Sequence, residues 1–69
     1  MERIKIDTPF IKLDSFLKLA LGISGGDAKN IINEGLVKVN ENIETRRGKK
    51  LYDHDKVSFE DEIFEVICL

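Results

Sequence analysis

Between residues 13 and 40, the spacing of the apolar residues changes from the period of a helix to the period of a strand. Within residues 13–20, and again within residues 28–35, apolar or small residues lie at positions i, i+3, i+4 and i+7. That spacing places them along one stripe of an amphipathic helix. From residue 36 onward, apolar and polar residues alternate in LVKVN, which is typical of a half-buried strand. Two helices followed by strands are therefore predicted.

Residues of cap and turn type mark the ends of both predicted helices. Gly22 is a natural stop for the first helix, and Gly35, in a left-handed conformation, ends the second. Ser24 precedes Asp27 by three residues, which is the spacing of a capping box. In this motif the Ser oxygen accepts an otherwise unpaired N–H of the first turn. We expect the second helix to begin after the segment GISGG.

Strand patterns also lie at both ends of the chain. Residues 3–7 alternate between charged and apolar side chains, and Thr8 and Pro9 then interrupt the pattern. Turn residues 40–42 follow the first strand after the helices. Further short strands are expected at Ile43, around Val57 to Phe59, and around Ile63 to Ile67 after an acidic turn. The predicted fold class is α+β, a single domain of residues 1–69 with two helices packed on a short antiparallel sheet.

The charge is distributed unevenly between the two ends of the chain. Residues 1–52 contain ten Lys and Arg against seven Asp and Glu, a net charge of +3, whereas residues 53–69 contain one against six, a net charge of -5. The formal net charge of -2 thus hides a dipolar molecule, and any anionic partner is expected at the basic part. No apolar stretch approaches the roughly 18 residues of a membrane span, and the N-terminus lacks the apolar core of a secretory signal. We expect a cytoplasmic protein without a membrane partner.

Nothing in the sequence has the pattern of a catalytic or metal site. Cys68 is the only cysteine, so it cannot form an intramolecular disulfide, and it is interpreted as a small buried apolar residue at the end of the last strand. His54 lies between two aspartates in an expected exposed turn, with no nucleophile pattern beside it. The segment SGGDAKN lacks the Gly-Lys-Ser/Thr ending of a phosphate loop. No enzymatic activity, cofactor or metal is predicted.

The segment TRRGKK, residues 45–50, has four cations in six positions. Alone it is typical of a solvated loop. The other lysines that lie off the apolar stripes change this interpretation, namely Lys12 and Lys18 on the first predicted helix, Lys29 on the second and Lys38 on the following strand. A basic face with Ser and Asn side chains among the cations is typical of a surface that binds the phosphate backbone of a nucleic acid.

These elements, taken in order, resemble the RNA-binding domain named after the fourth protein of the small ribosomal subunit, the S4 domain. The resemblance covers about residues 10–60 and consists of four elements: Lys12-Leu13-Asp14, the Ser24 turn leading to Ala28 and Lys29, Gly35 to Asn40 as Gly-x-Val-x-Val-Asn, and Asp55 to Val57. It is strongest toward the short stand-alone bacterial members, the YaaA-like proteins, which share the SGG turn and the RRG-basic-KL segment.

The resemblance implies binding of structured RNA, usually ribosomal or transfer RNA, through the two helices and the start of the hairpin. The implied RNA-binding residues are Lys12, Lys18, Ser24, Gly25, Gly26, Lys29, Lys38 and Asn40, with Arg46, Arg47, Lys49 and Lys50 alongside. Lys and Arg are expected to neutralise phosphates, whereas Ser24, the glycine N–H groups and Asn40 fix the register. Arg46 or Arg47 is also a candidate for stacking on an unpaired base.

Three positions depart from the family pattern. Gly25 and Gly26 stand where many members have a cation after the Ser, and Glu41 stands where many have Gly after Val-Asn. His54 replaces the Gly that usually precedes the Asp before the strand. The first departure removes a hydrogen-bond donor, so RNA binding is expected to depend more on backbone N–H groups and on TRRGKK. The other two departures are interpreted as turn variations.

The favoured function is a monomeric, non-catalytic RNA-binding protein acting in translation or ribosome assembly. The alternative is a protein-interaction module whose basic patch docks on an acidic protein surface. These two functions differ in the partner, RNA or protein, and therefore in how nuclease treatment affects association with ribosomes.

Overall fold

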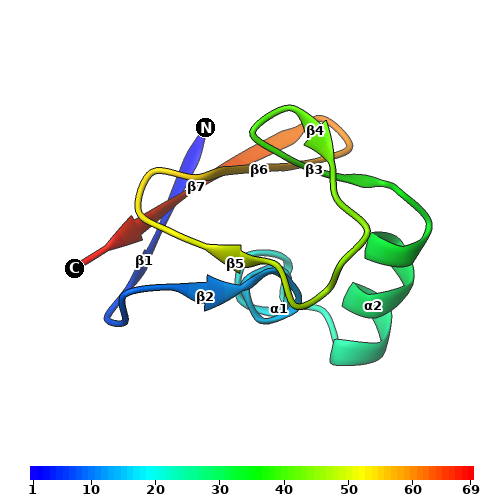
Figure 1. Cartoon of the computed structure of the whole chain (residues 1–69), viewed down its shortest axis with the longest axis horizontal. Helices are drawn as coiled ribbons and strands as arrows, with labels where there is room; N and C mark the ends of the chain where they lie inside the picture. The colour runs from blue at the N-terminus through cyan, green and yellow to red at the C-terminus, as the bar shows by residue number, and fades with distance from the viewer.

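The computed structural model describes residues 1–69 as two helices covering one face of a sheet (Figure 1). Both helices are short. Helix α1 spans Leu13–Leu21 and helix α2 spans Gly25–Asn33. Neither helix is long and apolar enough to cross a membrane. The strands are β1 (Glu2–Ile6), β2 (Ile11–Lys12), β3 (Val37–Val39), β4 (Asn42–Ile43), β5 (Lys50–Leu51), β6 (Lys56–Phe59) and β7 (Glu62–Cys68).

Five of the strands form one sheet in the order β1-β7-β6-β3-β4, and β2 and β5 form a separate antiparallel ladder. The α+β class and the packing of two helices on a sheet are as predicted. The sheet is mixed rather than wholly antiparallel, because β1 pairs in parallel with β7, from Glu2 opposite Phe64 to Ile6 opposite Cys68. The alternation in residues 3–7 predicted the strand correctly, but a period of two carries no information about which strand it pairs with.

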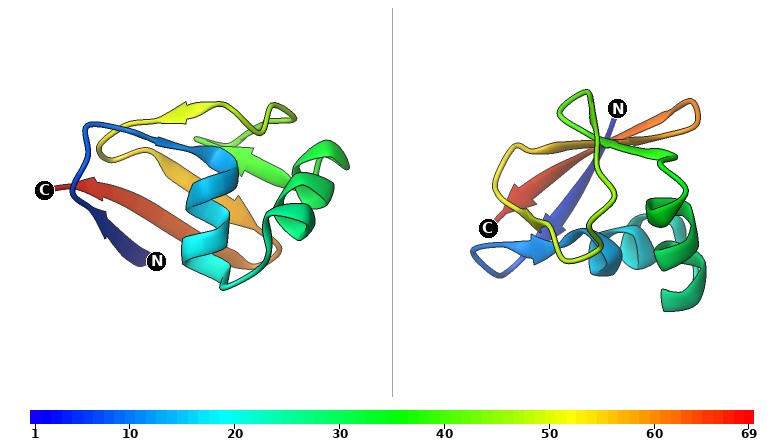
Figure 2. Two further views of the ribbon diagram at one scale, coloured as in Figure 1. Left: turned by 90° about the horizontal axis from the view of Figure 1, so that it is seen from below. Right: turned by 45° about the vertical axis from the view of Figure 1, so that its right-hand side comes forward.

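The apolar stripes of both helices and the inward side of the sheet form one core. The side chains of Phe16 in α1 and Phe64 in β7 are almost fully buried and meet edge to face, with 6.4 Å between ring centroids. This arrangement is a favoured geometry for aromatic pairs. Val37 and Val39 are buried in β3 while Lys38 between them is exposed. Figure 2 shows the helices as a layer on one side of the sheet, leaving the opposite, outer face uncovered.

The predicted helix ends are found with two adjustments. Gly22 has φ +66° and its N–H donates to the Lys18 carbonyl, and the Ser24 hydroxyl oxygen accepts the Asp27 N–H at 3.1 Å. Helix α2 begins directly after this cap, at Gly25, rather than after GISGG. Lys12 lies in β2, immediately before α1, instead of on the helix. Its backbone is extended because it pairs with β5.

Two of the turns explain where this chain departs from the family pattern. Glu41 has φ +74° and His54 has φ +71°, both in the left-handed region that L-residues other than Gly, Asn and Asp rarely adopt. These are the two positions at which the resemblance described above implies Gly. The left-handed backbone of the turns favours Gly at both positions, and this chain adopts it with larger residues.

Replacing Glu41 by Gly should stabilise the protein. The left-handed conformation costs a residue with a Cβ atom roughly 1–2 kcal/mol, and Gly gives back part of the gain through its greater freedom in the unfolded chain. We expect Glu41→Gly to raise the free energy of unfolding by up to about 1 kcal/mol in urea denaturation. Glu41→Ala is the matched control because it also removes the carboxylate but keeps the strain. A Gly variant no more stable than the Ala variant would contradict this explanation.

Candidate nucleic-acid interface

The basic loop, residues 45–50, descends from the sheet to the start of α1 (Figures 1 and 2). Its backbone is hydrogen bonded there: the Leu13 N–H donates to the Lys49 carbonyl at 2.9 Å, and the Asp14 N–H donates to the Arg47 carbonyl at 3.1 Å. The first amides of a helix have no partner inside the helix, so they require acceptors from elsewhere. The basic loop supplies these acceptors and is thereby held at the helix N-terminus.

The ladder between β2 and β5 brings two lysines together. Lys12 lies directly opposite Lys50, and both are exposed. Like charges directly opposite one another in an antiparallel pair are destabilising. The four ion pairs of the structure involve Arg3, Arg46 and His54 as cations, so no lysine forms an ion pair. The positive charge at this ladder is left without an internal counter-ion.

Arg46 differs from the other cations of the basic loop because it is held by Glu44. The Arg46 Nε–H donates to Glu44 Oε2 at 2.9 Å, an Nη2 hydrogen donates to Oε1 at 3.1 Å, and the Arg46 backbone N–H also donates to Oε2. These hydrogen bonds lower the pKa of Glu44 to about 2, and they raise the pKa of Arg46. The guanidinium is thus fixed in orientation and partly neutralised, whereas Arg47 forms no ion pair.

The start of α2 presents a second positive region. Gly25 and Gly26 are the first two residues of the helix, and both are exposed. Their N–H groups therefore have no carbonyl acceptor within the helix. A Cβ atom added at Gly25 would lie 3.7 Å from Cδ of Lys18, which shows that the Lys18 side chain passes beside this helix end. The partial positive charge of a helix N-terminus and a lysine therefore lie together.

The side chain of Asn40 is used within the fold. Its Nδ2 donates to Asp55 Oδ1 at 3.1 Å, and its Oδ1 accepts the Lys56 N–H at 2.9 Å. Asp55 also accepts the Tyr52 N–H through Oδ2 at 2.7 Å. Asn40 itself has φ +49°, which Asn tolerates better than most residues. The Asn and Asp of the family pattern thus connect two turns here, and any contact of Asn40 with RNA has to share these atoms.

Lys38 does not lie on the same face as the basic loop. It alternates with two buried valines in β3, so its side chain points to the outer face of the sheet, where Ser58 in β6 is its neighbour. The alternation that identified β3 places Lys38 opposite the helices. Lys29 is exposed on α2, in the helical layer. Of the sequence-predicted cations, Lys38 alone is therefore separated from the rest by the sheet.

An acidic cluster in the C-terminal part was not predicted from the sequence. Glu65 is almost buried, lies 3.3 Å from the Arg3 guanidinium and 3.1 Å from His54 Nδ1, and has a lowered pKa, chiefly through its hydrogen bond with His54. The other ring nitrogen of His54 lies 3.1 Å from Asp53. No group of three or more His, Cys, Asp or Glu side chains has the arrangement of a metal site. Part of the acidic charge of this region is thus paired internally.

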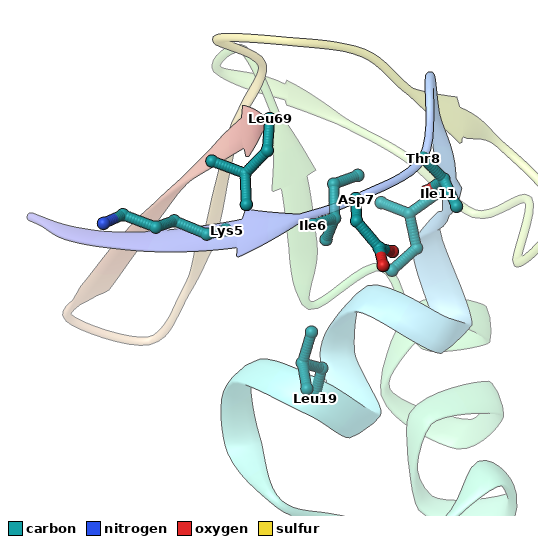
Figure 3. Close-up of a pocket in the computed structure, with 7 residues that line it drawn as sticks. All are labelled: Lys5, Ile6, Asp7, Thr8, Ile11, Leu19 and Leu69. Atoms are coloured by element: carbon teal, nitrogen blue, oxygen red, sulfur yellow. The ribbon is translucent and has the colours of Figure 1, made fainter.

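The surface pocket with the greatest volume lies away from these cations. It has a volume of about 650 Å³ and is lined mainly by apolar side chains from the end of β1, the start of β2, α1 and the C-terminus. Figure 3 shows Ile6, Ile11, Leu19 and Leu69 around this space, with the ammonium of Lys5 directed away from it. Its chemistry does not suit an anionic polymer.

A sequence model of the S4 domain matches residues 4–67. The chain belongs to the S4 domain family. It is 52% identical over 58 residues to a protein of Bacillus subtilis strain 168 named as a probable ribosome maturation protein, RlbA, and the match covers 83% of this chain and 82% of that protein.

Solved structures share this fold. YbcJ from E. coli, whose solution structure is described as containing an alpha-L motif involved in RNA binding, is 34% identical, with a TM-score of 0.73 over 99% of this chain and 89% of YbcJ. A pseudouridylate synthase is 28% identical, with a TM-score of 0.72, and this chain spans only 23% of its length. The ribosomal protein S4e of Thermoplasma acidophilum, 21% identical with a TM-score of 0.72 over 86% of this chain and 32% of that protein, shares the fold.

The ion pair beneath the basic loop should contribute to stability in a pH-dependent way. Because the pKa of Glu44 is about 2 in the folded protein and near 4.5 otherwise, its contribution is complete above pH 4.5 and is lost as the pH falls toward 2. We expect Glu44→Gln to flatten this part of the profile of unfolding free energy against pH. Glu41→Gln is the matched control, since Glu41 forms no ion pair. Equal profiles for the two variants would show that the ion pair does not stabilise the fold.

Proposed function

We propose that this chain is a non-catalytic RNA-binding protein that acts in ribosome maturation in the cytoplasm, as a monomer that binds structured ribosomal RNA. The binding face is the helical side of the molecule, formed by the basic loop, the β2–β5 ladder and the two helices. Its cations are Lys12, Lys18, Lys29, Arg46, Arg47, Lys49 and Lys50, and Ser24, Gly25 and Gly26 contribute the N-terminus of α2.

The observation that carries this proposal is the unneutralised pair formed by Lys12 and Lys50 beside the anchored basic loop. The fold places two exposed lysines at opposite positions of the ladder, and neither forms an ion pair with a carboxylate, which opposes stability. An anionic polymer removes this repulsion, because each phosphate that it contributes pairs with a cation and releases counter-ions. The rigid attachment of the basic loop to α1 keeps these cations in a constant arrangement.

The comparisons support RNA and the ribosome as the partner. Membership of the S4 domain family, the name of the Bacillus relative and the RNA-binding motif described for YbcJ all point in this direction. The pseudouridylate synthase shares only the part that corresponds to this chain, so its catalytic activity is not transferred. Binding to an acidic protein surface is the competing function, and the following experiment separates the two.

Substitutions on the helical side should weaken RNA binding more than substitutions on the outer face. We expect Lys12→Ala combined with Arg47→Ala to reduce affinity for purified ribosomal RNA at least about tenfold. About five phosphate contacts to single strands give a slope of log K against log salt near -3.5, and removing two should reduce its magnitude by about 1.4. Fluorescence anisotropy over a salt series measures both quantities.

Lys5→Ala combined with Lys56→Ala is the charge-matched control, because both lysines alternate with inward-facing residues and lie on the outer face. Its salt slope should remain that of the unsubstituted protein. The single variant Lys38→Ala tests whether Lys38 contacts RNA, as the resemblance implies, although it lies on the outer face. Equal losses in the two double variants would refute the proposed face, and association with ribosomes that survives nuclease treatment would favour a protein partner.

A further inference from the structure

Two aromatic residues that are not part of the core lie exposed beside the basic loop. Phe16 and Phe64 fill the core and Phe59 packs against it, whereas Phe10 is 36% exposed and Tyr52 is 52% exposed. Their ring centroids are 6.2 Å apart at an interplanar angle of 49°. Phe10 immediately precedes β2 and Tyr52 immediately follows β5, so the ladder that pairs Lys12 with Lys50 also brings these two rings together.

The position of Tyr52 is fixed by its backbone. Its N–H donates to Asp55 Oδ2 at 2.7 Å, and its carbonyl accepts the Asp55 N–H at 3.0 Å. The preceding residue, Leu51, is fully buried. On the side of the partner ring, the Lys50 ammonium lies 4.9 Å from the centroid of Phe10. The phenol hydroxyl makes no hydrogen bond within the protein, so the exposed ring is held in place without its polar group being used.

A hollow lies between Tyr52 and cations of the basic loop. It has a volume of about 490 Å³, within the range of small-molecule sites, and is lined by Arg46, Gly48, Lys49, Lys50 and Tyr52. One aromatic residue and three cationic residues thus line the same space. Because Gly48 has no side chain and nothing lies within 4 Å of where its Cβ would be, the backbone leaves the hollow open at that point.

This combination suits one unpaired nucleotide. A planar base stacks on an aromatic ring, and the phosphates on either side of it are within the reach of flexible lysine side chains. A base inside a duplex is stacked on its neighbours and cannot offer its face to Tyr52, so a purely duplex ligand leaves the ring unused. We propose that Tyr52 stacks on an unpaired base of the bound RNA, while Lys49 and Lys50 contact the adjoining phosphates. This inference rests on the proposed RNA-binding function and adds a preference for bulged or single-stranded nucleotides next to helical RNA.

The test uses the full chain and two RNA hairpins with identical stems, one fully paired and one with a single bulged 2-aminopurine. Tyr52→Leu should weaken binding of the bulged hairpin by roughly 5- to 150-fold, the range measured for loss of one aromatic stacking contact. Binding of the paired hairpin and the salt slope of both should remain unchanged. The change in 2-aminopurine fluorescence on binding should disappear in Tyr52→Leu and persist in Tyr52→Phe, which keeps the ring.

The outcomes distinguish this subsite from the RNA-binding function itself. If Tyr52→Leu weakens both hairpins equally or neither, while Lys12→Ala with Arg47→Ala still weakens both, the stacking subsite is refuted and the basic face stands. If the unsubstituted protein binds neither hairpin in a salt-dependent way, the proposed function fails together with the subsite. Urea denaturation of the Tyr52 variants shows whether the loss of contact with Phe10 has altered the fold. If Tyr52→Leu unfolds, the 2-aminopurine signal of the unsubstituted protein keeps the test decisive, because the absence of a fluorescence change on binding would refute stacking.

Discussion

The rest of the candidate site depends on two backbone hydrogen bonds, from the Leu13 and Asp14 amides to the carbonyls of Lys49 and Arg47. They join the start of α1 to a loop that is more than thirty residues away in the chain. The first amides of a helix require acceptors from outside the helix, and a loop rich in like charges is destabilised by their repulsion. These two hydrogen bonds supply the acceptors and hold the loop in place. The basic loop therefore turns its carbonyls toward the protein and keeps its charged groups available to solvent.

The two signs of charge are handled differently in this fold. Part of the acidic C-terminal region has internal partners: Glu65 is next to Arg3 and His54, and Asp55 accepts hydrogen bonds from Asn40 and Tyr52. The lysines form no ion pairs. A protein with a net charge of -2 can thus present a positive face, because the excess of acidic residues lies in residues 53–69 and the excess of basic residues lies in residues 1–52. The RNA-binding proposal and the acidic composition are compatible for this reason.

Local features of the sequence predicted local features of the structure. The two apolar stripes became α1 and α2, Gly22 and Ser24 cap them, and the alternation in residues 36–40 became β3. The resemblance to the S4 domain was confirmed by the family match over residues 4–67. Features that depend on distant partners were not predicted: the parallel pairing of β1 with β7, the extended pairing of Lys12, and the use of the Asn40 side chain to hold Asp55 and Lys56. The Tyr52 and Phe10 pair was missed as well, although an exposed aromatic beside TRRGKK was a signal that the sequence contained.

The sequence alone determined the two helices and the longer strands, the residues that cap the helices, and that the cations cluster in residues 45–50. These properties follow from the spacing of apolar residues and from the backbone preferences of single residues, so they need no knowledge of the rest of the chain. Only the tertiary structure decided which cations share a face. The alternation of side chains along β3 places Lys38 on the outer side of the sheet. The pairing of β2 with β5 brings Lys12 close to Lys50 and Phe10 close to Tyr52. Contacts between residues far apart in the chain are set by packing and hydrogen bonding of whole elements, which no local pattern encodes.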